Sequence, residues 1–299
     1  MHPYATAEYA KALAHIGRPQ FVESWQTHVL IRDWQGGAAD AAGPYPLTCI
    51  AAASDLHAGL EQLRHLGAVS VTIVADGLYG PAPEQLKTAF AFARPFKTHY
   101  LFDPAVGAYQ PSKHHRYEIR RAMQRGVEVR VVELAGAIDE WTALYAELVS
   151  RRGITGPQRF SRDSFAALAA CKDLIAIGAY VGDEMVSCHL WFRHGSCVWS
   201  HLAASNDRGY AIGAAYAVYD FAIRTFSGHI VNMGGSAGVT DARDDGLARL
   251  KSGFANRTKT TNVFGAILDA RAYRSLCGEQ SATNNDYFPA YRTPLPGNL

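Results

Sequence analysis

One short stretch near the end of the sequence combines glycines, aspartates and a single lysine. Residues 234–254 read GGSAGVTDARDDGLARLKSGF, directly after the apolar run HIVNM. The run predicts a strand that ends at Gly234 and Gly235, where the missing side chains let other groups approach the backbone closely. Lys251 follows in a short helical pattern beside apolar positions, so its ammonium group could lie along the edge of a cleft. An ordinary surface lysine is the alternative.

Two of the aspartates in this stretch have candidate roles. Asp245 is a candidate N-cap for a helix that begins near Gly246. Asp241 stands in the loop at the end of the predicted strand, and it is a candidate general base for removing a proton from an amine.

Histidines and tryptophans gather in a predicted three-strand meander. Successive side chains of a strand point to opposite faces, so His189 and Trp191 share one face of their strand, and Trp199 and His201 share a face of theirs. We expect Trp191 to contact the substrate. His201 is a second candidate general base, because imidazole titrates near about pH 6.5. Packing in the core is the alternative for these residues.

A basic helix is predicted from Ser112, which can cap it, to Gln124. Lys113, Arg116 and Arg120 are spaced i, i+3 and i+7 and so share one helix face. We expect this face to bind phosphates of coenzyme A, of a nucleotide-linked acceptor or of a tRNA end. The alternative is a solvated face with no ligand.

The sequence does not support metal, disulfide or covalent chemistry. The five cysteines are scattered and form no C-x-x-C pair. His114 and His115 are adjacent on the predicted helix and point about 100° apart, so they cannot ligate one metal ion together. No serine or cysteine stands in a nucleophile-elbow motif. We expect no metal, no permanently bound cofactor and direct transfer between substrates.

Composition sets the broad class of protein. The chain has 299 residues, 48% of them apolar, and a net charge of +2. This is enough for one large domain or two modest ones. A charge so close to zero does not favour DNA as a partner, and any basic patch must be local. We see no signal peptide and no apolar stretch of the roughly 18 residues that span a membrane, and we expect a cytoplasmic protein.

Helices and strands alternate along the whole chain, which predicts a mixed α+β fold. Predicted helices cover residues 6–16, 55–67, 82–93, 112–124, 138–153, 161–173 and 247–254, with a further long helix that ends near 226. Predicted strands cover residues 27–33, 46–53, 68–76, 96–103, 127–133, 174–181, 184–193, 196–204, 229–233 and 260–269. The turn-rich stretch 103–111 divides an amino-terminal half, 1–107, from a carboxyl-terminal half, 108–299, which ends in an irregular tail.

Four segments in this order resemble the GNAT superfamily of N-acyltransferases and, within it, the FemAB-like branch. They are SKHHRYEIRRAMQRGVEVRVVE, the three-strand meander, DRGYAIGAAYAVYDFAIRTF, and NMGGSAG with DGLARLKSGF. The resemblance covers residues 112–269, and the first hundred residues fit a degenerate partner half by element order. It implies two GNAT-like halves around twisted mixed sheets, without the coiled-coil arm that is usual in FemAB-like proteins.

The resemblance implies roles for the glycine turn and its lysine. In FemAB-like proteins the lysine that matches Lys251 lies at the reacting centre, where an ammonium group stabilises the developing oxyanion. The backbone of Gly234, Gly235 and Ser236 would then lie beside the substrate.

The resemblance also implies a donor-binding loop. In GNAT proteins a loop of the pattern Arg/Gln-x-x-Gly-x-Gly/Ala turns backbone N–H groups toward the pyrophosphate of coenzyme A at a helix N-terminus. Arg208, Gly209, Tyr210 and Gly213 take those places here, whereas Ala211 stands where the pattern has its first glycine. An ordinary connection into the long helix is the alternative.

We therefore expect an enzyme of the acyltransferase class. It would move an acyl group from an acyl-thioester donor such as acyl-CoA, bound only as a co-substrate, to an amine of a small-molecule or cell-wall-like acceptor. One alternative is an aminoacyl transferase that uses a charged tRNA. The other is a non-catalytic binding protein on a GNAT scaffold.

Overall fold

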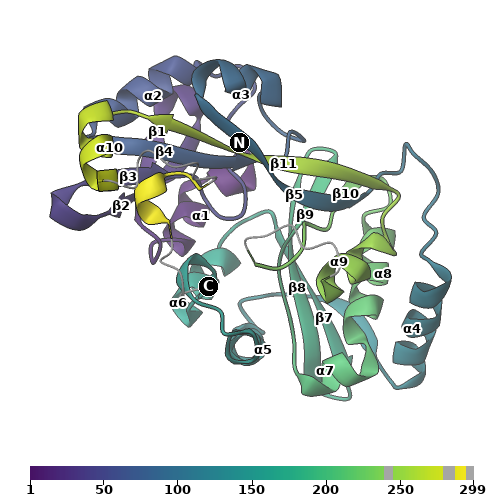
Figure 1. The fold of residues 1–299 in the computed structure, drawn as a ribbon. Coiled ribbons are helices and arrows are strands. Elements are labelled where there is room, and N and C mark those ends of the chain that lie inside the picture. The colour runs from purple at the N-terminus through teal and green to yellow at the C-terminus, as the bar shows by residue number, and fades with distance from the viewer. Residues whose placement is uncertain (239–244, 279–286, 294–299) are drawn as a thin grey trace. The chain divides into compact units, whose positions relative to one another are not determined.

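The computed structural model describes residues 1–238, 245–278 and 287–293, and its chain forms two compact units (Figure 1). Unit 1 comprises Met1–Pro95 together with Thr261–Leu299, and unit 2 comprises Phe96–Thr260. The mixed α+β class expected from the sequence is confirmed, because helices and strands alternate in both units.

The division differs from the expected halves 1–107 and 108–299. The chain leaves unit 1 within β5 (Phe92–Phe102) and returns to it within β11 (Arg257–Ile267). The cause is strand pairing, because the second half of β11 pairs antiparallel with β4 (Ala68–Ala75) of unit 1. The apolar pattern of β11 predicts a strand, but it does not say which strand it will pair with.

Unit 2 contains a sheet in the order β5-β10-β9-β8-β7-β6. Its other strands are β6 (Glu128–Val132), β7 (Leu174–Val181), β8 (Glu184–His194), β9 (Cys197–Ser205) and β10 (Ile230–Asn232). The pairs are antiparallel, except that β10 runs parallel to β9. The predicted meander is confirmed as β7–β9, with tight turns at Gly182 and Gly195, both of which have positive φ.

Helices cover both faces of this sheet (Figure 1). They are α4 (Lys113–Gln124), α5 (Ile138–Arg152), α6 (Arg162–Ala169), α7 (Asp207–Ile212), α8 (Ala214–Thr225) and α9 (Gly246–Ser252). The helices α5 and α6 lie on one face, and α8 lies with α4 on the other. The main core of unit 2 forms between the sheet, α8 and α9, where Trp191, Tyr219 and Phe254 are buried.

Unit 1 contains a sheet in the order β1-β2-β3-β4-β11. Its remaining strands are β1 (Arg18–Val22), β2 (Thr27–Asp33) and β3 (Ala39–Ala42). Its helices are α1 (Ala7–Ala12), α2 (Leu56–His65), α3 (Pro83–Ala89) and α10 (Ala270–Cys277), with 3-10 turns at Pro3–Ala5, Glu23–Trp25, Gln35–Gly37 and Ala290–Arg292.

Two expectations for single elements are wrong, and one helix was not expected. Residues 46–53 form no strand, and the strand that pairs with β4 is β3, which lies in the Gly/Ala-rich stretch before them. The helix α10 was not expected. The stretch after Asn206 is the helix α7 rather than a loop, because Asn206 Oδ1 caps it by accepting the N–H of Gly209 (2.8 Å).

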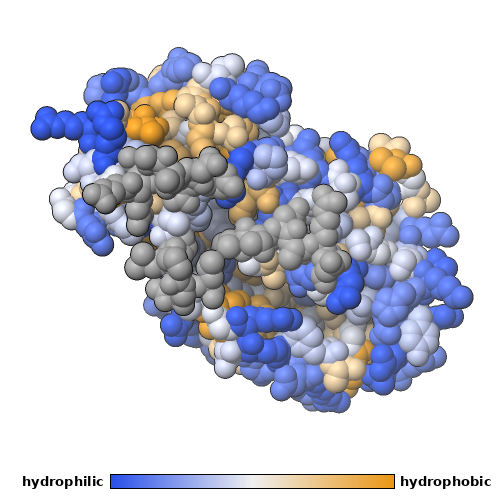
Figure 2. All heavy atoms as spheres, viewed as in Figure 1, coloured by the Kyte–Doolittle hydropathy of each residue, from blue (hydrophilic) through white to orange (hydrophobic). Residues whose placement is uncertain are grey.

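Among the described residues, none of the helices has the length and hydropathy that a bilayer crossing requires. On the face that Figure 2 shows, hydrophilic residues predominate and apolar residues occur in small separate groups.

Candidate active site

The candidate site lies in unit 2, where β9 and β10 separate. The two strands pair over only three residues, and the pairing ends with Asn232 opposite Trp199. The strand β9 nevertheless continues to Ser205. After Asn232 the backbone stays beside β5, because the N–H of Tyr100 donates to the carbonyl oxygen of Gly234 (3.2 Å). The last part of β9 therefore has no β10 neighbour, and the sheet parts at the predicted glycine turn.

The turn after β10 is held by its own polar contacts. Gly234 has φ +76°, a conformation that residues with a Cβ rarely adopt. Its N–H donates to Asn232 Oδ1 (2.9 Å), and the N–H of Ala237 donates to Asp245 Oδ2 (2.9 Å). The turn is thus fixed to the end of β10 and to the start of α9.

Lys251 points from α9 into this turn and is only 7% exposed. Its Nζ donates to the carbonyl oxygen of Gly235 (2.6 Å), its one hydrogen bond to the described residues. Since an ammonium group has three N–H donors, two remain for other acceptors. Burial and the ammonium group of Lys97 lower the pKa of Lys251 to about 7, and the Asp245 carboxylate opposes them.

A second buried lysine, Lys97 on β5, joins the same turn. Its Nζ donates to the carbonyl oxygens of Ser236 (2.8 Å) and Gly238. Sequence reasoning missed Lys97, which stands 139 residues before Ser236. The one available signal was a charged residue inside the strand pattern FKTHYLFD, and such residues more often face solvent.

The two glycines have different reasons. A Cβ on Gly235 would lie 3.1 Å from the carbonyl oxygen of Thr98 and 3.2 Å from the Cβ of Lys97, so this glycine makes room for the Lys97 stem. A Cβ on Gly234 would lie 3.4 Å from Lys251 Nζ, which is an ordinary contact, so Gly234 is explained by its positive φ.

His189 on β8 is the meander histidine whose pKa is affected by the charge of Lys251. It is buried against the ring of Tyr219, and its Nδ1 has no hydrogen-bond partner among the described residues. Burial and the Lys251 ammonium group lower the pKa of His189 to about 3, so this imidazole is neutral at physiological pH. A group that binds protons so weakly is a poor general base.

The structure does not bring His201 to this site. Its ring packs against Phe160 and Phe192, on the side of the sheet that α5 and α6 cover, whereas α9 belongs to the core on the opposite face. Burial lowers the pKa of His201 to about 3. The strand register explains this position. Trp199 pairs with Phe192 and Ser200 pairs with Trp191, so His201 lies on the face of Trp199 and Phe192, opposite that of Trp191.

Of three further residues that the sequence singled out, two have structural roles and one is not described. Trp191 is fully buried against Tyr219 and Phe226, so its ring is part of the core and offers no surface to a substrate. Asp241 lies outside the described residues. Asp245 caps α9 as predicted, since its Oδ1 accepts the N–H of Leu247 (3.2 Å).

The predicted donor loop makes internal contacts throughout. Arg208 forms an ion pair with Glu184 (2.5 Å), and Arg151 stacks on the ring of Tyr210. A Cβ on Gly209 would lie 2.1 Å from the carbonyl oxygen of Val186, so this glycine allows α7 to pack on β8.

Gly213 adopts φ +75° and turns the chain from α7 into α8. A glycine suits this position because the left-handed conformation carries no steric cost without a Cβ. The glycines of this stretch thus have packing and turn-forming reasons that are independent of any phosphate.

The basic face of α4 is exposed as predicted. Lys113, Arg116 and Arg120 all lie at the surface, although the Arg116 guanidinium also donates to the carbonyl oxygen of Pro111 (2.7 Å). Figure 2 shows mostly hydrophilic residues where Figure 1 places α4. Lys113 and Arg120 form no ion pair with the described residues, so their charges are available to an anion.

One histidine of α4 fixes the position of α9. His115 Nε2 donates to the carbonyl oxygen of Leu250 (2.8 Å), and its Nδ1 accepts from the hydroxyl of Ser112 (2.8 Å). This assignment follows because a carbonyl can only accept. Burial lowers the pKa of His115, which favours the neutral ring that this arrangement requires. Gly253 leaves the space for the ring, since a Cβ there would lie 2.0 Å from Cε1 of His115.

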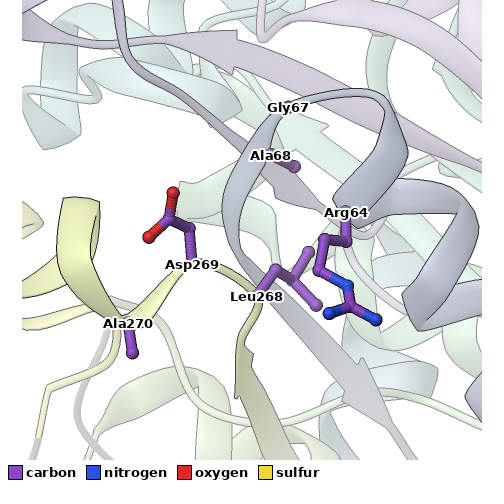
Figure 3. A pocket seen from close by; sticks show the side chains of 6 residues that line it. All are labelled: Arg64, Gly67, Ala68, Leu268, Asp269 and Ala270. Atoms are coloured by element: carbon purple, nitrogen blue, oxygen red, sulfur yellow. The ribbon is translucent and has the colours of Figure 1, made fainter.

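Other parts of the described chain offer no comparable site. No group of three or more His, Cys, Asp or Glu residues is placed to hold a metal ion. A shallow hollow of about 270 Å³ lies in unit 1 beside Arg64 and Asp269 (Figure 3). Asp269 caps α10, because its Oδ1 accepts the N–H groups of Arg271 and Ala272 (both 2.9 Å), so this carboxylate has a structural role.

Comparison with known proteins agrees with this arrangement. A family model for the acetyltransferase (GNAT) domain matches residues 112–234, from the start of α4 to the glycine turn. The matched segment, which is less than half of the chain, is similar to a GNAT acetyltransferase domain. Lys97 and Lys251 lie on either side of the matched residues, so the two cations of the site come from outside this segment.

Solved structures extend the likeness to nearly the whole chain. The structure of FemX has a TM-score of 0.64 at 12% identity and covers 92% of this chain and 95% of that one. L-PGS from Bacillus licheniformis has a TM-score of 0.60 at 12% identity over 87% of each chain. The C-terminal domain of a protein from Agrobacterium fabrum assigned as a lysylphosphatidylglycerol synthetase has a TM-score of 0.59 at 13% identity over 87% of each chain.

These matches confirm the FemAB-like GNAT fold with its two GNAT-like halves. A search of curated protein sequences finds no match to the chain.

The contact between α4 and α9 generates a stability prediction for unit 2. Gly253→Ala should lower the free energy of unfolding by about 1–3 kcal/mol, because the added methyl group displaces the His115 ring. Gly246→Ala in the same helix is the matched control, since its Cβ would meet no described atom within 4 Å. We expect denaturant titration to leave this control as stable as the wild type or slightly more stable. Equal losses of stability in both variants would contradict the explanation that Gly253 leaves space for the His115 ring.

Proposed function

We propose that the chain transfers an acyl group from an acyl-thioester donor of the acyl-CoA type to the amine of a small-molecule or cell-wall-like acceptor. The carrying observation is the convergence of Lys251, Lys97 and the glycine turn where β9 and β10 part. The GNAT domain and the FemX-like fold support acyl transfer in general. The choice of donor and acceptor is our proposal.

The proposed step is direct and balanced. The amine nitrogen attacks the thioester carbonyl, a C–N bond forms, the C–S bond breaks, and the proton lost by the amine replaces the acyl group on the thiolate. The carbonyl oxygen becomes an oxyanion on the way. Lys251 would stabilise it with the N–H groups that Gly235 leaves free, in a site where burial strengthens the interaction.

The proton acceptor in this proposal is Asp241, which stands between Gly238 and the start of α9 in the sequence. His189 and His201 are both less suited, because burial lowers their pKa values to about 3. The backbone of Gly234, Gly235 and Ser236 would contact the acyl donor beside Lys251. The donor would be held only for the reaction, as a co-substrate.

Donor binding is proposed at the segment that includes Arg208, Gly209, Tyr210 and Gly213, with the exposed α4 face as a second phosphate contact. Arg208 is already paired with Glu184, so donor binding requires Arg208 to exchange this carboxylate for a phosphate. Both side chains are about half exposed, and the exchange therefore costs little free energy.

A second candidate donor is an aminoacyl-tRNA, with tRNA as the partner. The specific observation is the α4 face, where Lys113 and Arg120 are exposed and form no ion pair with the described residues. One structural neighbour is assigned as a lysylphosphatidylglycerol synthetase, and a lysyl group is an aminoacyl group. A non-catalytic protein on this scaffold is the outcome if neither donor is used.

The two donors are separated by a direct experiment. With acetyl-CoA and a panel of primary amines, we expect release of CoA and formation of an amide that ribonuclease treatment leaves unchanged. Activity that appears only with aminoacylated tRNA and disappears after ribonuclease treatment would replace acyl-CoA with the second candidate. No product with either donor would contradict both.

Lys251→Ala should lower turnover at least about tenfold, because it removes an oxyanion contact. The pH dependence of turnover gives a second test of Lys251. Because the pKa of Lys251 is about 7, the charged form is lost as pH rises through that value, so turnover should fall on the alkaline side. Lys87→Ala is the control, since Lys87 lies on α3 of unit 1 and pairs with Glu84. Unchanged turnover in folded Lys251→Ala would remove this lysine from the mechanism.

Arg208→Ala should raise the apparent KM for the acyl donor several-fold and leave kcat nearly unchanged, because it removes a ground-state phosphate contact. Arg162→Ala is a matched control, since Arg162 is likewise exposed and paired with a surface carboxylate, that of Asp139 (2.8 Å). Steady-state kinetics at varied donor concentration would measure both. An unaltered KM in Arg208→Ala would make the segment a structural connection.

A further inference from the structure

Lys97 is a buried cation on β5, and the proposed reaction gives it no role. It donates to the carbonyl oxygens of Ser236 (2.8 Å) and Gly238, while Lys251 donates to that of Gly235 (2.6 Å). Two ammonium groups from different elements thus bind neighbouring carbonyl groups of one turn. Such a turn cannot move without breaking bonds to both β5 and α9.

We propose that Lys97 is a positioning residue for acyl transfer: it holds the Gly235–Gly238 turn by its carbonyl groups, so that Lys251 keeps one fixed hydrogen bond and directs its remaining N–H groups at the reacting carbonyl. The inference rests on the proposed function, in which Lys251 stabilises the oxyanion. It adds a second lysine whose own contacts are to the turn.

The aliphatic part of Lys97 supports this role. A Cβ on Gly235 would lie 3.2 Å from the Cβ and 3.3 Å from the Cδ of Lys97, so the glycine backbone lies directly on the lysine stem. The turn is therefore held by van der Waals contact along the stem as well as by hydrogen bonds from the ammonium group. A shorter or uncharged side chain would loosen the turn on which Lys251 depends.

The titratable groups around Lys251 come from four elements. Lys97 on β5 lowers the pKa of Lys251, and Asp245 at the start of α9 raises it. His189 on β8 is neutral, because its own pKa is about 3. His115, which packs on α9 from α4, has a lowered pKa. Lys97 is thus the cation that opposes the charge on Lys251, and an oxyanion at Lys251 would relieve that repulsion.

The test is a titration of Lys251 that needs no substrate. The protein is labelled with 13Cε-lysine, the Lys251 signal is assigned by its loss in Lys251→Arg, and its pH midpoint is measured by NMR. In Lys97→Met we expect the midpoint to move upward from about 7 by about one pH unit. The pH at which turnover falls on the alkaline side should also rise, and kcat should fall.

Three further variants make the result specific. Lys97→Gln removes the charge but keeps an N–H donor, so the Lys251 midpoint should also rise, and this variant decides the outcome if Lys97→Met does not fold. Lys97→Arg keeps the charge, so the midpoint should stay near the wild-type value and kcat should partly recover. Lys87→Met, on unit 1, should change neither quantity.

The outcomes separate the two proposals. An unchanged Lys251 midpoint in folded Lys97→Met or Lys97→Gln, together with wild-type acyl transfer, would overturn the role of Lys97 alone. A raised midpoint together with no acyl transfer by the wild-type protein would contradict the proposed function and leave the coupling between the lysines in place. A purely structural role would lower stability without moving the midpoint.

Discussion

The buried contact between two ammonium groups and one glycine turn is the interaction on which the site depends. Burying a charge is unfavourable unless hydrogen bonds replace the lost water. Here the carbonyl oxygens of Gly235, Ser236 and Gly238 supply them. A carbonyl oxygen carries only a partial charge, so that of Gly235 leaves the charge of Lys251 incompletely compensated by the described residues. An anion that develops nearby is therefore stabilised by groups that are already in place.

A buried charge in unit 1 shows the contrast. The Asp40 carboxylate is almost completely buried, and Arg32 binds it at 2.8 Å while Arg292 binds its other oxygen. The Tyr291 hydroxyl donates to it as well (3.1 Å). A carboxylate with two guanidinium partners is fully compensated, so it stabilises its unit and offers nothing to a ligand. Lys251 forms no ion pair with the described residues, and this difference favours the chemical role that we propose for the site in unit 2.

The sheet of unit 2 provides the rigid frame for these lysines. The strand β10 leaves β9 after Asn232 and stays beside β5, which brings the glycine turn to the strand that carries Lys97. The clamp of His115 on Leu250 then sets the distance of α9 from α4. The two lysines come from separate elements, β5 and α9. Hydrogen bonds to the backbone hold each of these elements in place. Catalytic geometry of this kind depends on the supporting contacts as much as on the reacting groups.

The sequence by itself determined most of the elements, the GNAT resemblance and the approach of Lys251 to the glycine turn. These rest on local signals: apolar periodicity, capping residues such as Ser112 and Asp245, and glycines at strand ends. Only the tertiary structure decided that Lys97 joins Lys251, and that His201 lies on the other face of its sheet. Strand pairing between distant segments sets the first position, and the register of β9 against β8 sets the second. Neither leaves a periodic trace in the sequence, because both depend on which strand becomes a neighbour rather than on the strand's own residues.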